Sequence, residues 1–216
     1  MLLVRHRRPL SMMLQHCYPV SAGLAIVGKA PVAPGGGMRR SIHAGETSAS
    51  KWRKPEAGRL KLNFDGSSKT ASRRASIGGV YRDHEGGFVL GYAERIGRAT
   101  SSVAELAALR RGLELALENG WLNISIEGDA KTVVDVVRKR ASVRAEEDLR
   151  QCEEIAALLP LLDDGGGMAV SHVRRAGNRV AHGFAKLGHG VTRPRVWRGV
   201  PPDEVLRYLQ RDSEGK

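Results

Sequence analysis

The sequence predicts an α/β domain in which a mixed five-stranded sheet packs against helices. Three segments with alternating apolar and polar residues follow one another directly, which predicts antiparallel strands joined by short turns. Two more strand-like segments then alternate with segments whose apolar residues recur at helical spacing. This order is typical of three antiparallel strands extended by parallel ones, with helices packed on the sheet.

The boundaries of the elements come from local residue patterns. Apolar and polar residues alternate in the first strand until Asp65-Gly66. The glycines of the connector 83–87 supply the positive φ angles that a hairpin needs. Gly120 ends the first helix and Pro160 ends the third. We expect strands at 60–65, 77–81, 88–92, 123–127 and 168–173, and helices at 102–119, 131–139, 146–159 and 178–187.

Charge and composition divide the chain into three parts. The net charge is +12, and half of this excess lies in the first 45 residues, which contain six basic residues and no acidic one. With its prolines and the run at 35–37, this composition predicts a disordered organellar presequence in residues 1–50, directed to a mitochondrion or plastid. The alternative is a basic arm that stays attached and contacts nucleic acid; without import, the protein is expected in the cytoplasm or nucleus. Residues 51–190 form the predicted domain and 191–216 a C-terminal extension.

The remaining bulk features exclude several classes of protein. Cys17 and Cys152 lie far apart, without the spacing of a metal or disulfide motif, so a reducing compartment is expected. No apolar stretch approaches the length of a membrane span, so no membrane partner is expected. No pattern indicates a particular oligomer, and a monomer is the default expectation. The positive charge favours an anionic partner such as nucleic acid.

Four polar residues stand at the ends of predicted elements, and each has a local structural explanation. Asp65 can begin a turn. Glu105 follows Ser102 at the spacing of a capping box. Asp129 and Asn178 can each cap the helix that follows. Taken singly, each residue is more easily explained by these local roles than by catalysis.

Taken together, the same acidic residues predict a metal site. If the first and fourth strands are neighbours, Asp65 and Asp129 meet at one edge of the sheet, with Glu105 in the first turn of the helix between them in sequence. Carboxylates held this close repel each other unless a cation lies between them. Oxygen ligands on rigid elements suit Mg²⁺, and two such ions about 4 Å apart can activate a water and stabilise the leaving oxygen of a phosphodiester.

The motifs that contain these residues resemble the RNase H family, and in particular the plant RNase H-like domains related to reverse transcriptases. Trp52 before the first strand and Trp197 after the last predicted helix fit the same family. The resemblance covers about residues 52–210, and it depends on the order of the motifs because each one is short. The matching segments are 61–67 (KLNFDGS), 104–109 (AELAAL), 126–130 (IEGDA), 172–175 (HVRR) and 178–182 (NRVAH).

The resemblance implies an RNase H-like fold and a metal-dependent endonuclease that hydrolyses the RNA strand of RNA–DNA hybrids by a two-metal mechanism. It assigns Asp65, Glu105 and Asp129 as metal-binding catalytic carboxylates, with Mg²⁺ or Mn²⁺ as the cofactor. His172 matches a family histidine proposed to move protons or to help product release. Asn178 matches a position that contacts the substrate.

The chain departs from the family pattern at the fourth catalytic position, where His182 stands in place of the usual aspartate. The surrounding residues keep the register, so this is a substitution. One negative charge is lost and imidazole suits softer metals, which predicts weaker Mg²⁺ binding and a better fit to Mn²⁺. We expect His182 to remain a catalytic and metal-binding residue, or to act as a general base. The alternative is a helix residue in a domain that no longer cleaves.

Basic residues near the motifs are candidate substrate contacts. Lys69, in the loop after the first strand, and Arg174 and Arg175, beside the last motif, can reach the phosphates of an RNA–DNA hybrid or a structured RNA. A solvated basic surface explains these three residues equally well.

Other functions fit the sequence to different degrees. The main alternative is a weakened or inactive nucleic-acid-binding domain derived from a retroelement. Integrase-like strand transfer is disfavoured because neither a DDE arrangement nor a separate DNA-binding domain is evident. Dinucleotide binding is excluded because no GxGxxG motif follows a strand.

Overall fold

The structure is a computed structural model that describes residues 51–139, 141–165 and 168–214. The predicted presequence, residues 1–50, lies outside these residues, and its role in import stays a prediction.

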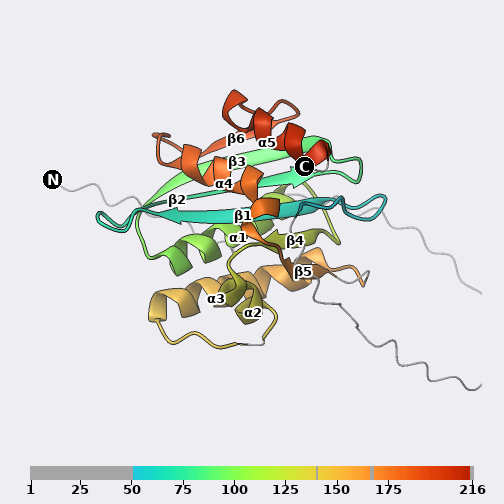
Figure 1. The fold of residues 1–216 in the computed structure, drawn as a ribbon. Coiled ribbons are helices and arrows are strands. Elements are labelled where there is room, and N and C mark those ends of the chain that lie inside the picture. Colours follow the sequence, from blue (N-terminus) through green and yellow to red (C-terminus); the bar gives the residue numbers. More distant parts are fainter. Residues whose placement is uncertain (1–50, 140, 166–167, 215–216) are drawn as a thin grey trace, which may run out of the picture. The chain divides into compact units, whose positions relative to one another are not determined.

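The domain is built on one mixed sheet of six strands in the order β5-β4-β1-β2-β3-β6 (Figure 1). The first three strands form the expected antiparallel meander. β4 pairs with β1 and β5 with β4, both in parallel, which confirms the predicted mixed topology. The sixth strand, antiparallel to β3, was not predicted, so the expected number of five was wrong. The strands are β1 (Lys61–Ser68), β2 (Arg74–Arg82), β3 (Phe88–Arg98), β4 (Ser125–Gly128), β5 (Ala169–His172) and β6 (Arg195–Arg198).

Helices cover both faces of the sheet (Figure 1). On one face, α1 (Ser101–Glu118) packs against β1 and β2, and α3 (Glu146–Leu158) packs on α1 beside the short α2 (Lys131–Val137). On the other face, α4 (Arg179–Gly188) lies across β1, β2 and β3, and α5 (Asp203–Ser213) packs on α4. Within the described ranges, no helix combines the length and the apolar character needed to cross a membrane.

Alternation along β1 separates the core from the site. Leu62 and Phe64 point into the larger core cluster together with Leu106 and other residues of α1. Successive side chains of a strand point to opposite faces, so Asp65 is directed to the α4 side of the sheet. A second cluster on that side joins β2, α4 and α5 through Val80, Val180, Phe184 and Val205. Both faces of the central strands are therefore buried.

The predicted C-terminal extension forms part of the packed structure. β6 extends the sheet at β3, and Val205 of α5 is fully buried against α4. Arg82, at the end of β2, is almost completely buried and its Nη1 donates to Asp212 Oδ2 of α5 at 2.6 Å. The guanidinium of Arg82 also lies 3.5 Å from the ring centroid of Trp52, whose Nε1 donates to Asn63. Residues from both ends of the domain thus meet beside β1 and β2.

Several strands continue beyond their predicted ends. β1 runs three residues past Asp65, because Gly66, Ser67 and Ser68 all pair with β2. β3 extends from Phe88 to Arg98, well past the expected end at 92, since β2 pairs along most of its length. Hydrogen bonding to a neighbouring strand overrides the local turn propensity of glycine and serine at these positions.

Candidate active site

Asp65 and Asp129 are brought together by the parallel pairing of β1 with β4. Phe64 lies opposite Gly128 in this register, so each aspartate is the next residue of its chain segment after a paired position. Asp65 is completely buried, and the side chain of Asp129 is 6% exposed. The predicted neighbourhood of the first and fourth strands is confirmed. Asp65 lies inside β1 and not at its end, while Asp129 directly follows β4.

Glu105 reaches the same place from α1 because β1 and α1 approach unusually closely at Gly66. A Cβ atom at Gly66 would overlap the backbone of Ala104 and Glu105, so only glycine allows this approach. The backbone N–H of Gly66 donates to the Glu105 carboxylate. The helix therefore holds Glu105, which is 8% exposed, against the strand that holds Asp65.

The local structural roles considered for the three acids are not used in the structure. α1 is capped by Thr100, whose Oγ1 accepts from the backbone N–H of Val103 at 3.2 Å, so Ser102 and Glu105 form no capping box. Ala130 occupies the cap position of α2, and no side chain caps that helix. Asp65 begins no turn, because the strand continues. Convergence, and not local capping, explains why the three acids stand where they do.

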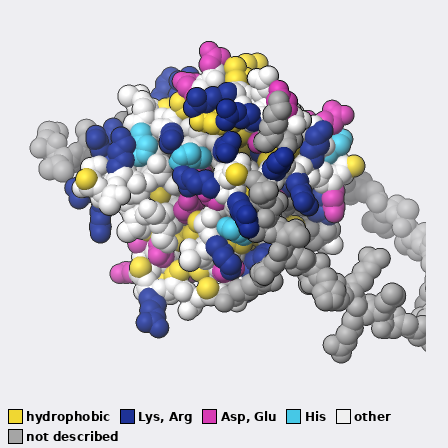
Figure 2. All heavy atoms as spheres, viewed as in Figure 1, with side chains coloured by type: hydrophobic (Ala, Val, Ile, Leu, Met, Phe, Trp, Pro, Cys, Tyr) yellow, Lys and Arg dark blue, Asp and Glu magenta, His cyan; other side chains and the backbone are white. Residues whose placement is uncertain are grey.

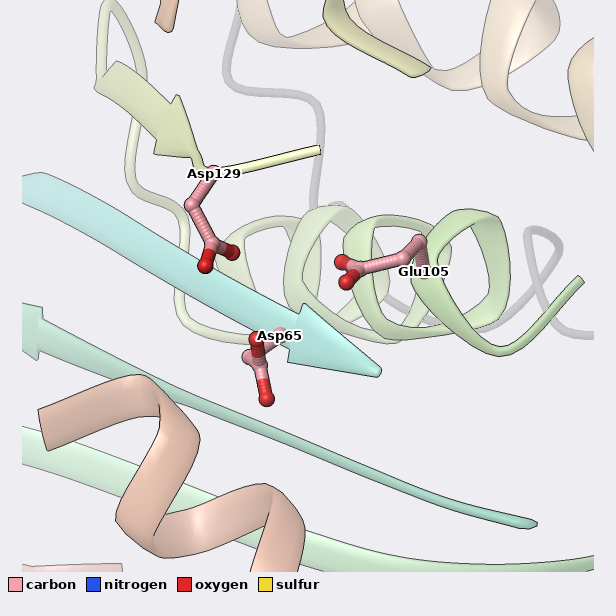
Figure 3. Close-up of side chains that lie close together, drawn as sticks. All are labelled: Asp65, Glu105 and Asp129. Atoms are coloured by element: carbon pink, nitrogen blue, oxygen red, sulfur yellow. The ribbon is translucent and has the colours of Figure 1, made fainter. Parts of the chain in front are cut away.

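The three carboxylates form one group that fits a hard divalent cation. They come from β1, α1 and the end of β4, with Glu105 and Asp129 directed toward each other across β1 (Figure 3). One ligand oxygen from each lies within 4.8 Å of the others, and no other group of this kind occurs among the described residues. Oxygens on opposite sides of a Mg²⁺ or Ca²⁺ ion are separated by about 4–5 Å. The donor set and its spacing therefore fit such an ion.

Two buried oxygens of this group lack a hydrogen-bond donor within the described part of the chain. They are Asp65 Oδ1 and Glu105 Oε2. Buried carboxylate oxygens without donors are costly, because each loses its hydration without replacement. A cation bound between Asp65 and Glu105 would compensate both oxygens.

Burial and mutual repulsion perturb the titration of the acids. Burial raises the pKa of Glu105 to about 9, and the negative charges of Asp65 and Asp129 contribute to this rise. Burial also raises the pKa of Asp65, against the opposing effect of its hydrogen bond with His182. Both shifts express the difficulty of ionising all three acids without a counter-charge.

His182, in the first turn of α4, contacts the opposite side of Asp65. Its Nδ1 lies 3.0 Å from Asp65 Oδ2, and its side chain is 23% exposed. The Nη2 atom of Arg175 lies 2.9 Å from Nδ1 and 3.2 Å from Nε2 of the same ring. One tautomer serves both neighbours: Nδ1 donates to Asp65 and Nε2 accepts from Arg175. His182 thus lies beside the carboxylate group, as its place in the motif predicted.

Arg175 also binds the carboxylates directly. It belongs to a 3-10 turn, Arg175–Gly177, between β5 and α4. Its Nη1 donates to Asp129 Oδ2 at 3.1 Å and lies 3.9 Å from Asp65 Oδ1. Sequence reasoning proposed Arg175 only as a phosphate contact and missed this arrangement. The seven-residue interval to His182 carries no signal for it, because the contact depends on the turn that precedes α4.

Asn178, directly before α4, and His172, at the end of β5, support Asp129. The Nδ2 of Asn178 donates to Phe64 O at 2.9 Å and to Asp129 Oδ1 at 3.0 Å, and the residue is 1% exposed. His172 is the last residue of β5, and its Nε2 lies 3.2 Å from the backbone oxygen of Asp129. Asn178 therefore positions a carboxylate here, and contact of either residue with a substrate stays a prediction.

Positively charged residues gather near the end of β1, beyond Asp65. Ser67 points to the same face as Asp65, and its Oγ lies 3.0 Å from Nε2 of His189, which follows α4. Burial lowers the pKa of His189, and three positive charges lower it further, those of Lys69, Arg74 and Arg95. Figure 2 shows Lys and Arg side chains over the face that carries α4 and at its left-hand end, where the connection between β1 and β2 lies.

A hollow opens beside His182 on the same side of the domain. It has a volume of about 370 Å³ and is lined by Arg175, Ala176, Arg179, His182 and Tyr208. Tyr208 comes from α5, to which the sequence assigned no role in the site. The hollow gives solvent, or a polyanion, access to His182 and Arg175. Arg174, the third predicted phosphate contact, is exposed and directly precedes the 3-10 turn Arg175–Gly177.

Comparison with known proteins adds evidence on the family. The sequence model of a family described as reverse transcriptase-like matches residues 63–188. A protein of Arabidopsis thaliana, named as a candidate ribonuclease H protein, is 28% identical over 165 residues, which is 76% of this chain and 26% of that protein. Ribonuclease HI of Halobacterium salinarum is 32% identical over 128 residues, which is 59% of this chain and 63% of that protein. This chain thus spans less than two thirds of the length of either relative.

Solved structures show the same fold. The crystal structure of RNase H1 from Halobacterium salinarum superposes with a TM-score of 0.56 at 30% identity, over 61% of this chain and 97% of that one. The N-terminal RNase H domain of rv2228c from Mycobacterium tuberculosis superposes with a TM-score of 0.55 at 27% identity, over 61% and 94% of the two chains.

Proposed function

Because this chain belongs to the reverse transcriptase-like family, whose model matches residues 63–188, we propose that it is a divalent-cation-dependent nuclease that hydrolyses the RNA strand of RNA–DNA hybrids. The observation that carries the proposal is the pair of buried oxygens without donors, Asp65 Oδ1 and Glu105 Oε2, within a group of three carboxylates. The fold shared with RNase H1 of Halobacterium salinarum supports the hybrid as substrate.

The residues of this chain divide the chemistry among them. Asp65, Glu105 and Asp129 would hold the cation, with Mg²⁺ or Mn²⁺ as the candidates. A bound cation would polarise the scissile phosphate and lower the pKa of an attacking water. Asn178 fixes the carboxylate of Asp129 through its amide hydrogens. Orienting donors of this kind affect metal binding about 10–100-fold in other metal sites.

His182 handles the proton in the proposed reaction. It orients the attacking water or takes its proton through Nε2, which the guanidinium of Arg175 must first leave for the phosphate, while the Nδ1 contact with Asp65 fixes the ring. The water oxygen bonds to phosphorus, the bond from phosphorus to the ribose O3′ breaks, and O3′ takes up a proton. The two-metal form of this mechanism, with His182 as a ligand, remains a prediction; it needs a second cation where Arg175 contacts Asp129.

Basic residues on the α4 side would hold the nucleic acid. Lys69, Arg74 and Arg95 surround His189 at one end of the site, and Arg175 and Arg179 line the hollow beside His182. The exposed Arg174 directly precedes Arg175. Phosphate contacts of this kind position a duplex without reading its sequence. Discrimination of RNA from DNA requires contacts to the 2′-hydroxyl groups.

A cleavage assay with the full chain tests the proposal. A labelled RNA–DNA hybrid is incubated with the protein and either Mg²⁺ or Mn²⁺, and we expect cleavage of the RNA strand only, faster with Mn²⁺. Asp65→Asn and Asp129→Asn should each abolish the activity. Cleavage that survives both substitutions would come from a contaminant, and a wild-type chain that binds the hybrid without cutting it would contradict the enzyme function.

The second candidate is an inactive nucleic-acid-binding domain derived from a retroelement. The observation in its favour is that Arg175 and His182 already engage Asp129 and Asp65. Under this hypothesis the hybrid binds with the same affinity whether or not a cation is present. Residues 1–50 remain a proposed organellar presequence, which an import assay with these residues fused to a reporter would test.

A further inference from the structure

The two sides of the carboxylate group are unequal in their hydrogen bonding. Two of its oxygens, Asp65 Oδ1 and Glu105 Oε2, accept from no donor in the described part of the chain. On the side of α4, Asp65 Oδ2 contacts His182, and Asp129 Oδ2 accepts from Arg175. Within the carboxylate group, the oxygens without a donor are therefore Asp65 Oδ1 and Glu105 Oε2, whereas side chains of the chain itself engage Asp65 Oδ2 and Asp129 Oδ2.

The guanidinium of Arg175 lies where a second cation would have to bind. Any ion bridging the two aspartates on the α4 side needs oxygens that Arg175 Nη1 already approaches, at 3.1 Å for Asp129 Oδ2 and 3.9 Å for Asp65 Oδ1. Its other amino group, Nη2, contacts the imidazole of His182. This imidazole stands where the family pattern has a carboxylate, so the negative charge of that carboxylate is absent.

The formal charges agree with this arrangement. Three ionised carboxylates and one guanidinium leave two negative charges, which one divalent ion neutralises. Four carboxylates without the guanidinium would leave four negative charges, which two divalent ions would neutralise. The side chain of Arg175 is 60% exposed, so water partly screens its charge, but its partners Asp65 and Asp129 are buried, where screening is weaker.

We propose that Arg175, held by Asp129 and His182, takes the place of a second metal ion, so that this chain binds a single divalent cation between Asp65, Glu105 and Asp129. This inference rests on the proposed function for its metal site. It makes Arg175 a built-in positive charge beside the reacting phosphate. It also links the histidine at position 182 to Arg175, because an imidazole accepts a hydrogen bond from the neighbouring guanidinium without adding negative charge.

Counting bound Mn²⁺ tests the proposal without any measurement of activity. Electron paramagnetic resonance of the full chain, titrated with Mn²⁺, reports free ions by their hexaaqua signal and reveals ion pairs about 4 Å apart by their magnetic coupling. We expect one ion per chain and no coupled signal in the wild type. The double variant Arg175→Met with His182→Asp should bind two ions with a coupled signal.

Matched variants keep the test decisive. Arg150→Met removes the same charge from α3, which packs on α1 and not on α4, and should leave one ion per chain. If circular dichroism shows that the double variant does not fold, Arg175→Met alone should admit a second ion at least about tenfold more tightly than the wild type does. Two coupled ions in the wild type, or a single ion in a folded double variant, would overturn the proposal.

The outcome is separable from that of the proposed function. A wild-type chain that binds one Mn²⁺ but leaves the hybrid intact would refute the nuclease and keep the inference. A chain that cleaves the hybrid with two bound ions would support the nuclease and refute the inference.

Discussion

The Nδ1 atom of His182 lies 3.0 Å from Oδ2 of Asp65, although the two residues are 117 positions apart in the chain. The contact joins the first turn of α4 to the centre of β1, two elements that also pack together. A histidine fixed by a carboxylate in this way keeps one ring nitrogen for a second partner. Its chemical role is therefore testable by substitutions that keep the first contact.

Replacement of His182 by asparagine should separate proton transfer from positioning. An asparagine amide can still donate to Asp65 but cannot take up a proton. We expect kcat for hybrid cleavage to fall at least about 10²-fold, the usual contribution of a general base, with little change in the Kd for Mn²⁺. Single-turnover kinetics and a Mn²⁺ titration measure the two quantities. Unchanged kcat in His182→Asn would exclude His182 as the base.

The stability of the cation-free protein should fall as the pH rises. Glu105 has an ordinary pKa of 4.5, which burial raises to about 9 in the folded chain. Between these values the folded state binds a proton that the unfolded state has released, so unfolding becomes easier with increasing pH. The raised pKa of Asp65 acts in the same direction. Thermal unfolding in a chelator from pH 5 to pH 9 should show a decreasing Tm.

Glu105→Gln tests the source of this pH dependence. The amide has the shape of the protonated acid and no charge, so we expect a gain of about 1–3 kcal/mol in the free energy of unfolding at pH 8 and a flatter profile. Glu153→Gln, on the exposed side of α3, is the matched control and should leave the profile unchanged. A profile as steep in Glu105→Gln as in the wild type would assign the effect to other groups.

Gly66 should tolerate no side chain. A Cβ atom there would overlap the backbone of α1, so strand and helix must separate. We expect Gly66→Ala to lose about 3 kcal/mol of stability, at the upper end of the range for overpacking, and to weaken Mn²⁺ binding because Glu105 moves with α1. In Gly190→Ala the new Cβ would meet Leu187 O at an ordinary 3.5 Å, so this control should change stability by less than about 0.5 kcal/mol.

The basic residues around His189 should control affinity for the hybrid through salt-dependent contacts. We expect the double variant Lys69→Gln with Arg74→Gln to bind the hybrid more weakly, with the slope of log K against log salt reduced by about 0.7–0.9 for each lost phosphate contact. Fluorescence anisotropy in the presence of Ca²⁺ measures this. Arg150→Gln, on α3, should leave the slope unchanged. An equal loss of affinity at all salt concentrations would contradict a phosphate contact.

The ion pair of Arg82 with Asp212 should dominate the attachment of α5. Both side chains are nearly buried, at 1% and 6% exposed, with 2.6 Å between Nη1 and Oδ2. Removing one partner leaves a buried charge alone, so Asp212→Ala should lower the free energy of unfolding by about 3–5 kcal/mol. The double variant Arg82→Met with Asp212→Leu should recover most of this loss in urea denaturation. Failure to recover would indicate that packing, and not charge, is decisive.

The sequence predicts the elements well where one local pattern decides them. The alternation before Asp65, the glycines of the 83–87 connector and the helical spacing after Ser102 each depend on neighbouring residues alone. β6 escaped prediction because four residues with two arginines, Arg195–Arg198, carry no strand pattern of their own. This segment becomes a strand through its pairing with β3, which no local window contains.

The candidate site likewise contains residues that the sequence could predict and residues that it could not. The three acids could be predicted, because their motifs occur in a fixed order and two of them follow apolar strand residues. Arg175 could not, since its position depends on the 3-10 turn between β5 and α4 and on the register of β4 with β5. The burial that leaves Asp65 Oδ1 and Glu105 Oε2 without donors is equally a property of the packed structure. Sequence thus identifies the candidate ligands, while their surroundings require the fold.

The pair of Arg82 and Asp212 also has a consequence for synthesis on the ribosome. The arginine emerges 130 residues before its counter-ion, while β2 is a central strand of the sheet. Until Asp212 has left the exit tunnel, a nascent chain that closes the sheet would enclose an unpaired guanidinium beside Trp52. We therefore expect folding to be completed only once α5 is available, and ribosome stalling before that point to leave a nascent chain dependent on chaperones.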